Sequence, residues 1–381
     1  WEKPQGKNPP LKTAKRYHIV PRGVGLVIGC ATFPTWNTYP GMFASLATGN
    51  TVALKPHAGA ILPAAITVEI AQDVLREAGL PPYIVSLLVA EDSHALTKAA
   101  ALRPEVGVID YTGNTEFGNW LETEARQAQV YTEKAGLNAI IIDDFDNLKG
   151  MSRNLAFTLS LYSGQMCTTS QNIYIPRDGV NTPDGRVSFD EVAGMIAGGV
   201  DKFLSDPDRA AEVLGAIQAD ATFARTQAAT NFGEVLLAPT EREHPHFPDA
   251  RVISPAIIKL DAEQDRETYC SEQFGPIAFM IAVDGVEDGI ARARDLTQTH
   301  GAITWSVYSS RDEILAQTEE AAIDAGVALS CNLTGGVFVN QSAAFSDYHA
   351  TGANPAANAC LTDSAFVANR FRVVQSRRDV E

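Results

Sequence analysis

Short apolar segments alternate with amphipathic, helix-forming stretches along the N-terminal part of the chain. The apolar segments are brief and partly β-branched, which is typical of buried parallel strands. Between two of them, the stretch Pro63–Ala78 has a helix-forming composition with an apolar face and stops at Gly79, before Pro81-Pro82. This alternation predicts a doubly wound α/β sheet. The expected strands are Val24–Cys30, Thr51–Lys55, Tyr83–Val89, Val106–Tyr111 and Ala139–Ile142.

A second unit is expected to follow Glu133. The helical stretch Asn154–Tyr162 leads to a strand at Asn172–Ile175, and the polar or proline-containing segments Gly185–Asp190 and Thr240–Phe247 are predicted to be loops. The tail, Ala365–Gln375, alternates in the manner of a strand. An exposed strand of this kind needs a partner edge, and Tyr17–Val20 is the expected partner.

Composition and charge exclude several classes of protein. The chain has 381 residues, enough for two domains, and its 45% hydrophobic and 20% charged content is ordinary for a globular protein. A net charge of −16 argues against nucleic-acid binding, which needs clustered Lys and Arg. The sequence contains no run of 18 apolar residues, so it predicts no membrane-spanning helix. The five cysteines show no C-x-x-C motif, which indicates reduced thiols in a cytoplasm and no metal site: Cys30, Cys167, Cys270, Cys331 and Cys360.

One cysteine and one glutamate suggest nucleophilic catalysis. Cys167 follows Tyr162-Ser163-Gly164-Gln165-Met166, and Glu133 lies upstream. A thiol reacts as the thiolate, so a catalytic cysteine needs backbone amides to stabilise its charge, and Gly164 permits such a nest. A separate carboxylate can activate the water that releases a covalent intermediate. The alternative is a buried cysteine and an unrelated surface glutamate.

Both segments resemble the active-site signatures of the aldehyde dehydrogenase superfamily, Gly-Gln-x-Cys and Glu-Leu-Gly-Gly-Lys-Asn-Pro. The resemblance implies a Rossmann-type cofactor domain, an α/β catalytic domain and a small oligomerisation strand in a homodimer or homotetramer. The implied ranges are 1–20 (strand or linker), 21–133 (cofactor), 134–350 (catalytic) and 351–381 (C-terminal return and strand). Further blocks follow the family's order: Pro21–Gly25, Leu46–Pro56, Tyr111–Gly118 and Glu272–Pro276.

The N-terminus differs from that of the family. The first residue is Trp1 and the first family-like block begins at Pro21, whereas relatives carry a longer preceding segment. We therefore expect that an N-terminal part of the cofactor domain is missing. A naturally short homologue is the alternative.

Cofactor choice is expected to depend on the segment after the strand Thr51–Leu54. Lys55 would emerge at the carboxyl end of the sheet, where its ammonium can bind a ribose or a phosphate. The family places a glutamate three residues later to bind the 2′-hydroxyl of NAD, but here that position is Ala58. His57 adds a nearby donor. We therefore expect a preference for NADP, with NAD possible. A solvated strand-end lysine is the alternative.

Two further segments resemble cofactor-binding motifs. The turn after the strand Val106–Tyr111 resembles the family's pyrophosphate turn, where helix N-terminal amides attract the phosphates. Glu272 and Phe274 match the residues that hold the nicotinamide ribose and pack on its ring. The alternatives are an ordinary capped helix start and plain loop anchors. The turn residues implied in binding are Gly113, Asn114, Thr115 and Gly118.

The oxyanion hole has two candidates. Relatives use the Asn of Pro-Trp-Asn-Phe-Pro together with the nucleophile's own N–H. An ungapped alignment puts Thr32 at that position, while Asn37 would serve if the loop were shifted. This departure resembles the branch that oxidises CoA-linked semialdehydes in phenylacetate and benzoyl-CoA degradation.

The expected reaction is oxidation of a small-molecule aldehyde to the acid, with Cys167 as nucleophile and Glu133 as base. A CoA-acylating aldehyde dehydrogenase is one alternative, although that class generally lacks the glutamate. A catalytically inactive binding or scaffold homologue is the other.

Overall fold

The computed structural model describes residues 1–90, 93–134, 136–340 and 364–380. The chain divides into two compact units. The first comprises Trp1–Tyr111, Asn119–Tyr131 and Cys360–Glu381, and the second comprises Thr112–Gly118 and Thr132–Ala359. The four ranges expected from the sequence stay a prediction. Cys360 and positions 351–363 of the expected C-terminal return lie outside the described residues.

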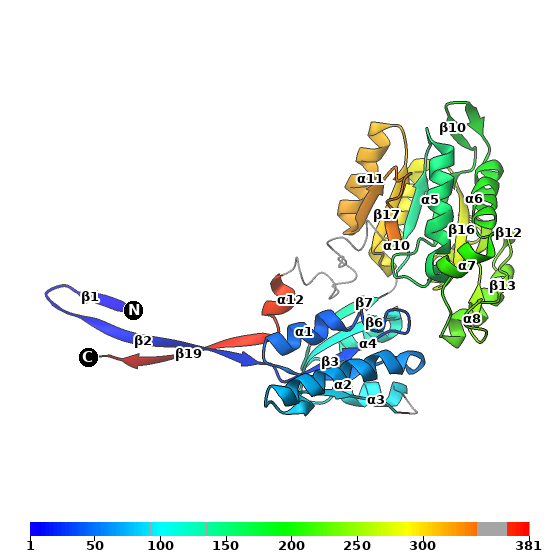
Figure 1. Ribbon diagram of the computed structural model, residues 1–381. Coiled ribbons are helices and arrows are strands. Elements are labelled where there is room, and N and C mark those ends of the chain that lie inside the picture. The colour runs from blue at the N-terminus through cyan, green and yellow to red at the C-terminus, as the bar shows by residue number, and fades with distance from the viewer. Residues whose placement is uncertain (91–92, 135, 341–363, 381) are drawn as a thin grey trace. The chain divides into compact units, whose positions relative to one another are not determined.

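The first unit contains a five-stranded sheet in the order β5-β4-β3-β6-β7 (Figure 1). Strand β3 pairs in parallel with both β4 and β6, and β4 pairs in parallel with β5, as the alternating pattern predicted. Val27, Val52 and Leu54 pack with Val68 of α2 in one apolar cluster. The elements are β3 (Val24–Ile28), α1 (Tyr39–Ala47), β4 (Thr51–Lys55), α2 (Ile61–Glu77), β5 (Val85–Leu87), α3 (Ser93–Ala101), β6 (Val106–Gly113), α4 (Thr115–Glu124) and β7 (Gln129–Lys134).

The chain ends form a separate antiparallel ribbon in this unit, made of β1 (Glu2–Gln5), β2 (Asn8–Pro21) and β19 (Phe371–Asp379). β19 runs beside β2, with Gln375 opposite Tyr17 and Arg372 opposite Val20, so the expected pairing is confirmed (Figure 1). The expected start of the tail strand is wrong, because α12 (Ser364–Ala368) occupies it. In that helix the amide of Asn369 donates to the Ala365 carbonyl, which makes a helical turn instead of a strand.

Arg370 fixes the tail to the sheet of the first unit. Its side chain is fully buried and makes a bidentate ion pair with Asp110 of β6, at 2.7 Å from Nη1 and 2.5 Å from Nη2. Nη1 also donates to Ser45 Oγ at 2.9 Å, and Nε donates to the Phe366 carbonyl at 3.0 Å. A buried guanidinium needs this degree of pairing to offset its desolvation.

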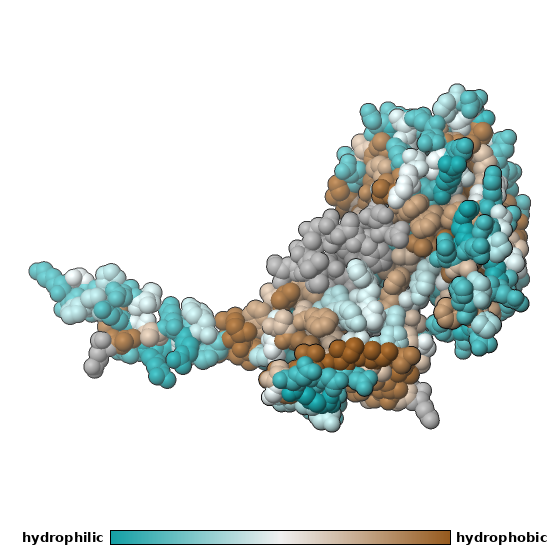
Figure 2. Space-filling view, in the orientation of Figure 1, coloured by the Kyte–Doolittle hydropathy of each residue, from teal (hydrophilic) through white to brown (hydrophobic). Residues whose placement is uncertain are grey.

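Helix α2 carries an exposed apolar stripe. Leu62, Ile66, Ile70 and Val74 recur every four residues and are between 46% and 70% exposed. Figure 2 shows hydrophobic residues gathered over this helix. Among the described residues, Ala58–Glu77 is the one helical stretch that could cross a membrane by length and composition. A single such helix is weak support for a span, and the expectation of no membrane partner stays a prediction.

The second unit is built on a seven-stranded sheet in the order β12-β15-β16-β9-β8-β17-β18. All neighbours pair in parallel except β12, which is antiparallel to β15. Helices α10 and α11 pack on one face and α5, α6 and α7 on the other (Figure 1). The strands are β8 (Ala139–Ile142), β9 (Asn172–Pro176), β12 (Glu234–Leu237), β15 (Ala256–Asp261), β16 (Ile277–Val283), β17 (Thr304–Tyr308) and β18 (Ala328–Cys331).

Smaller elements complete this unit. The helices are α5 (Leu148–Ser160), α6 (Phe189–Phe203), α7 (Pro207–Val213), α8 (Asp220–Gln227), α9 (Arg266–Tyr269), α10 (Val286–His300) and α11 (Asp312–Ala325). Two short hairpins pair β10 (Val180–Thr182) with β11 (Gly185–Val187), and β13 (Glu241–Arg242) with β14 (Val252–Ile253).

Both predicted loops of the second unit therefore contain regular structure. Gly185–Asp190 includes strand β11 and the start of α6, where Ser188 and Glu191 form a capping box. That Ser-x-x-Glu signal was present in the sequence and predicts a helix start. Thr240–Phe247 includes the two-residue strand β13, which no apolar alternation announces.

Candidate active site

The segment before Cys167 has an unusual backbone. After α5, a short 3₁₀ turn at Leu161–Gly164 contains left-handed residues: φ is 55° at Tyr162, 50° at Ser163 and 61° at Gly164. Left-handed conformations are costly for residues with a side chain, so the surrounding structure must stabilise them. Ser163 Oγ donates to the Ile253 carbonyl at 3.1 Å, and Gln165 Nε2 donates to the Ala216 carbonyl at 3.1 Å.

The Cys167 segment also contacts the segment of Glu272 and Phe274. A side chain at Gly164 would collide with the carbonyl of Gly275, so glycine is required there for both its φ and this close approach. Gln171 Oε1 accepts from the Gln273 amide at 2.6 Å, and its Nε2 donates to the Ser271 carbonyl at 3.2 Å. The structure thus brings two of the predicted motifs together.

Asn138 joins the Glu133 motif to Cys167. Its Nδ2 donates to the carbonyls of Cys167, at 2.7 Å, and Thr169, at 3.0 Å. Its Oδ1 accepts from the amides of Ile303, at 2.8 Å, and Thr304, at 3.1 Å. Asn138 occupies the asparagine position of the Glu133 motif, but the sequence alone did not predict this role. Its position inside the Glu133 signature was the available signal.

Glu133 lies near the end of β7 and is only 1% exposed. It is therefore not a surface glutamate, which was the alternative interpretation. Glu133 and the chain after it belong to the second unit, where the Leu137 amide donates to the Gly301 carbonyl at 2.8 Å and Gly136 packs against the Gly301 backbone. Cys167 itself is partly exposed, as a thiol that reacts with a ligand must be.

Glu272 has a strongly perturbed acidity. Burial raises its pKa to about 8, an effect that the positive charge of Arg225 partly opposes. Arg225 also donates from Nη1 to the Phe274 carbonyl at 2.8 Å, which holds this segment in place. The raised pKa favours the protonated carboxyl, which can donate as well as accept a hydrogen bond.

Lys55 and His57 lie in the first unit, at and just after the carboxyl end of β4. Burial lowers the pKa of Lys55. Burial and the charge of Lys55 lower the pKa of His57. His57 Nδ1 accepts from the Gly59 amide at 3.0 Å, so the neutral ring carries its proton on Nε2. His57 is thus a hydrogen-bond donor more than a cation at neutral pH.

The turn after β6 starts helix α4. Asn114 Oδ1 accepts from the Phe117 amide at 2.8 Å, and the Gly118 amide donates to the Asn114 carbonyl at 3.2 Å. Asn114 is therefore the N-cap of α4, as the alternative interpretation had it. A cap of this kind leaves the helix dipole directed at the turn, so phosphate binding by Gly113–Gly118 stays a prediction.

The two oxyanion candidates lie close together in the first unit, around Cys30. Its Sγ is 3.6 Å from Thr32 Oγ1 and 3.5 Å from Asn37 Oδ1. The amide of Phe33 also donates to this sulfur, at 3.4 Å. Thr32 and Asn37 both contact the same sulfur although they are five residues apart. Their positions in the sequence therefore do not decide which of them completes the oxyanion hole. Within the described residues no group of three His, Cys, Asp or Glu side chains could hold a metal ion.

Residues 2–328 match the aldehyde dehydrogenase family. The chain belongs to the aldehyde dehydrogenase family. An NAD-dependent aldehyde dehydrogenase from Burkholderia multivorans is 62% identical over 100% of this chain and 68% of that one, with a TM-score of 0.95. The expected α/β aldehyde dehydrogenase fold is therefore confirmed. A 1-pyrroline-5-carboxylate dehydrogenase from Thermus, at 18% identity and a TM-score of 0.65 over 97% of this chain and 68% of its own, shares the fold.

Curated relatives are more distant. The N-succinylglutamate 5-semialdehyde dehydrogenase of Burkholderia pseudomallei is 28% identical over 81% of this chain and 60% of its own length. A putative aldehyde dehydrogenase, FUS7 of Gibberella moniliformis, is 27% identical over 79% and 61%. The chain thus spans about 60% of the length of the curated relatives it matches.

Proposed function

We propose that this chain carries the catalytic apparatus for oxidising an aldehyde to a carboxylic acid with a nicotinamide cofactor. The observation that supports this most is the amide of Asn138, which bonds the carbonyl of Cys167 and so ties the Glu133 motif to the nucleophile segment. A cysteine with only a structural role would not require the left-handed turn before Cys167, the close backbone contact at Gly164 or the buried carboxylate of Glu133.

The residues present fit a dinucleotide. Lys55 and the Gly113–Gly118 turn each follow a parallel strand at its carboxyl end, the usual place for nucleotides in α/β sheets. Lys55 and His57 would hold the adenosine ribose, and Glu272 and Phe274 the nicotinamide ribose and ring. When bound, the nicotinamide accepts the two electrons that leave the aldehyde carbon.

Our preference for NADP rests on Ala58, which cannot repel a 2′-phosphate. Two observations favour NAD instead. The 62% identical protein is described as NAD-dependent, and the lowered pKa of His57 disfavours the imidazolium that would attract a phosphate. A comparison of kcat/KM with NADP and with NAD tests the proposed preference.

The chain's own residues would act in sequence. The Cys167 sulfur bonds to the aldehyde carbon, and its N–H donates to the resulting oxyanion, with Thr32 or Asn37 as the proposed second donor. After oxidation to the thioester, Glu133 takes a proton from water. The hydroxide oxygen bonds to the acyl carbon, the carbon–sulfur bond breaks, and the Cys167 thiolate and the acid are released.

We infer a semialdehyde as the substrate class. The motif departures at positions 31–37 and 133–136 suggest a CoA-linked semialdehyde, whereas the Burkholderia pseudomallei relative is named for N-succinylglutamate 5-semialdehyde. A homo-oligomer is proposed from the exposed β1-β2-β19 ribbon. A cytoplasmic location is proposed from the free cysteines.

The test is a substrate screen of the purified chain with NADP and NAD against CoA-linked and carboxylate-terminated semialdehydes. Release of the free acid in the absence of CoA supports the proposal. Acyl-CoA formed only when free CoA is added would establish the acylating reaction instead. Cofactor binding without turnover of any aldehyde would favour an inactive binding homologue.

A further inference from the structure

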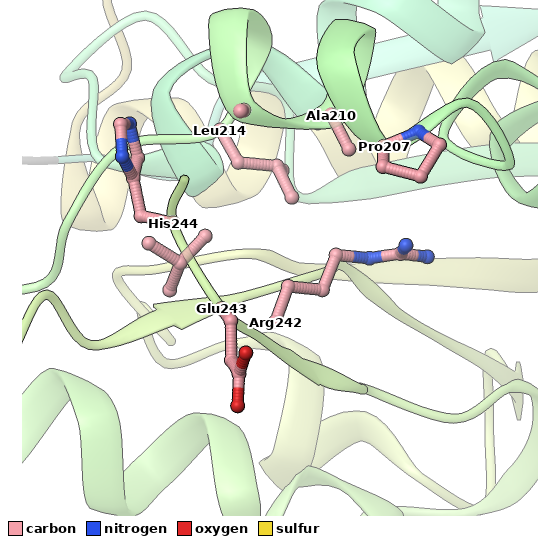
Figure 3. Close-up of a pocket in the computed structure, with 8 residues that line it drawn as sticks. Pro207, Ala210, Leu214, Arg242, Glu243 and His244 are labelled. Carbon is pink, nitrogen blue, oxygen red and sulfur yellow. The ribbon is translucent and has the colours of Figure 1, made fainter. Parts of the chain in front are cut away.

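A cavity of about 250 Å³ lies in the second unit, away from the residues assigned to catalysis. Helix α7 and the residue after it form one wall, and the segment from β13 forms the other (Figure 3). The volume is below the roughly 300–1,000 Å³ of pockets for drug-sized molecules, so a small ligand is the fitting occupant. The lining residues are Pro207, Ala210, Ala211, Leu214, Arg242, Glu243, His244 and Val252.

Arg242 makes no ion pair among the described residues, although the chain carries a net charge of −16. Its Nε is buried and, among the described residues, has no hydrogen-bond partner. Arg370, in contrast, satisfies its Nε and both terminal nitrogens. Arg242 lines the cavity, so an anion bound there would pair with its guanidinium charge through the terminal nitrogens.

The neighbours of Arg242 alternate as in a strand. Figure 3 shows Arg242 and His244 extending to opposite ends of the cavity, while Glu243 points away from α7. His244 Nδ1 accepts from the His246 amide at 3.2 Å, so the neutral ring presents an Nε2 proton. The cavity therefore offers hydrogen-bond donors at its two ends, and the nearby carboxylate is directed elsewhere.

The remaining wall is apolar, since it is made by proline, alanine, leucine and valine side chains. A bare inorganic anion would leave this surface unused. We propose that the cavity is a binding site for a small monocarboxylate with an aliphatic tail, its carboxylate held by Arg242 and its tail packed along α7. Binding here does not depend on the proposed enzymatic function.

The cavity wall is continuous with the support of the Cys167 loop. Leu214 precedes Gly215, which packs on the ring of Tyr162, and Ala216, whose carbonyl accepts from Gln165. Val252 precedes Ile253, whose carbonyl accepts from Ser163. A ligand that fixes α7 against β14 therefore also restrains the left-handed turn, and this coupling acts in both directions.

The test uses hexanoate as the probe, titrated into the whole chain by calorimetry or ligand-observed NMR. Arg242→Gln should weaken binding at least about tenfold, because charge-assisted hydrogen bonds are lost. It should fold normally, since this guanidinium makes no bond to the described residues. Ala211→Leu, which fills the cavity, should weaken binding similarly, and Glu243→Gln is the matched control that should retain it.

Three results would overturn the site. They are equal binding by Arg242→Gln, equal binding of the neutral hexanamide, and no saturable binding at tens of millimolar. If inorganic phosphate bound as tightly as hexanoate, the apolar wall would contribute nothing to affinity. That result would contradict the proposal of a monocarboxylate with an aliphatic tail.

The link to the loop has its own measurement, the rate of Cys167 alkylation by iodoacetamide, followed by peptide mass spectrometry. Hexanoate should change this rate in the wild type and in Glu243→Gln but not in Arg242→Gln. A change that persists in Arg242→Gln would place the probe at Cys167 itself and overturn the link. An unchanged rate with hexanoate bound would overturn it too.

Discussion

The segments that carry Cys167 and Lys55 are held in opposite ways. The Cys167 loop is fixed by side-chain hydrogen bonds from Asn138, Ser163, Gln165 and Gln171, which reach four other segments of the second unit. The segment Lys55–Ala58 follows a strand and has one such contact of its own, from the Gly59 amide to His57. The proposed bond-making chemistry would thus rely on a rigid support, whereas the proposed cofactor choice would rest on side chains that substitution can change without disturbing the fold.

Removing the nucleophile should have the largest effect. Cys167→Ala should abolish aldehyde oxidation and leave cofactor affinity within a few-fold, because the thiol adds little to ground-state binding. Steady-state rates and cofactor titration check this. Turnover near the wild-type rate would refute the assignment and direct attention to Cys30, Cys270, Cys331 and Cys360.

Glu133→Gln tests the base separately from the nucleophile. If Glu133 acts only in thioester hydrolysis, a burst of reduced cofactor should remain while turnover falls by roughly 10²–10⁴-fold. Rapid-mixing absorbance at the reduced-cofactor band measures both. Loss of the burst together with turnover would mean that Glu133 serves the thiol or the fold.

Asn138→Ala tests whether the rigid support matters. It leaves two amides and two carbonyls without their buried partner, so unfolding free energy should fall by about 2–4 kcal/mol and kcat by tens of fold. Asn138→Asp keeps the acceptor for Ile303 and Thr304 but loses the donor to Cys167. Recovery of stability without recovery of kcat in Asn138→Asp would assign the positioning role to the donor side. Wild-type kcat in Asn138→Ala would contradict that role.

Ala58→Glu tests the adjustable segment. A charged hydrogen bond to the 2′-hydroxyl is worth about 1.5–3 kcal/mol, so the wild type should prefer NADP by at least roughly tenfold in kcat/KM, and the variant should shift toward NAD. Ala58→Gln is the neutral control, which adds an acceptor without repelling a phosphate. Equal efficiency with both cofactors in the wild type would show that the 2′ position is recognised elsewhere.

Glu272→Gln should have the smallest effect, and one that depends on pH. The unfolded carboxyl ionises near its usual 4.5 and the folded one near 8, so the wild type loses stability as pH rises through this window. The variant cannot ionise. Its unfolding free energy should match the wild type at pH 5 and exceed it at pH 9 by roughly 1–2 kcal/mol, since partial exposure restores some hydration. Parallel pH profiles would contradict the raised pKa.

The sequence predicted the parallel strands because short, partly β-branched apolar runs are local signals, as at Thr51–Lys55 and Ala139–Ile142. It predicted Cys167 and Glu133 through short motifs. It could not predict that Asn138 reaches Thr304, or that Gly164 meets Gly275, because contacts between distant segments leave no local pattern. The tail was taken for a strand throughout because alternation does not distinguish a short helix such as α12.

The pairing of Arg370 with Asp110 has a consequence for biosynthesis. These residues are 260 positions apart, and the first unit includes both β2 and β19. The ribosome synthesises Asp110 and its sheet 260 residues before it synthesises Arg370, the ion-pair partner of Asp110. The second unit, bounded by Thr132 and Ala359 apart from one short segment, is complete before then. Nascent chains should therefore acquire the sheet of the second unit first, with Asp110 unpaired until Arg370 has been synthesised.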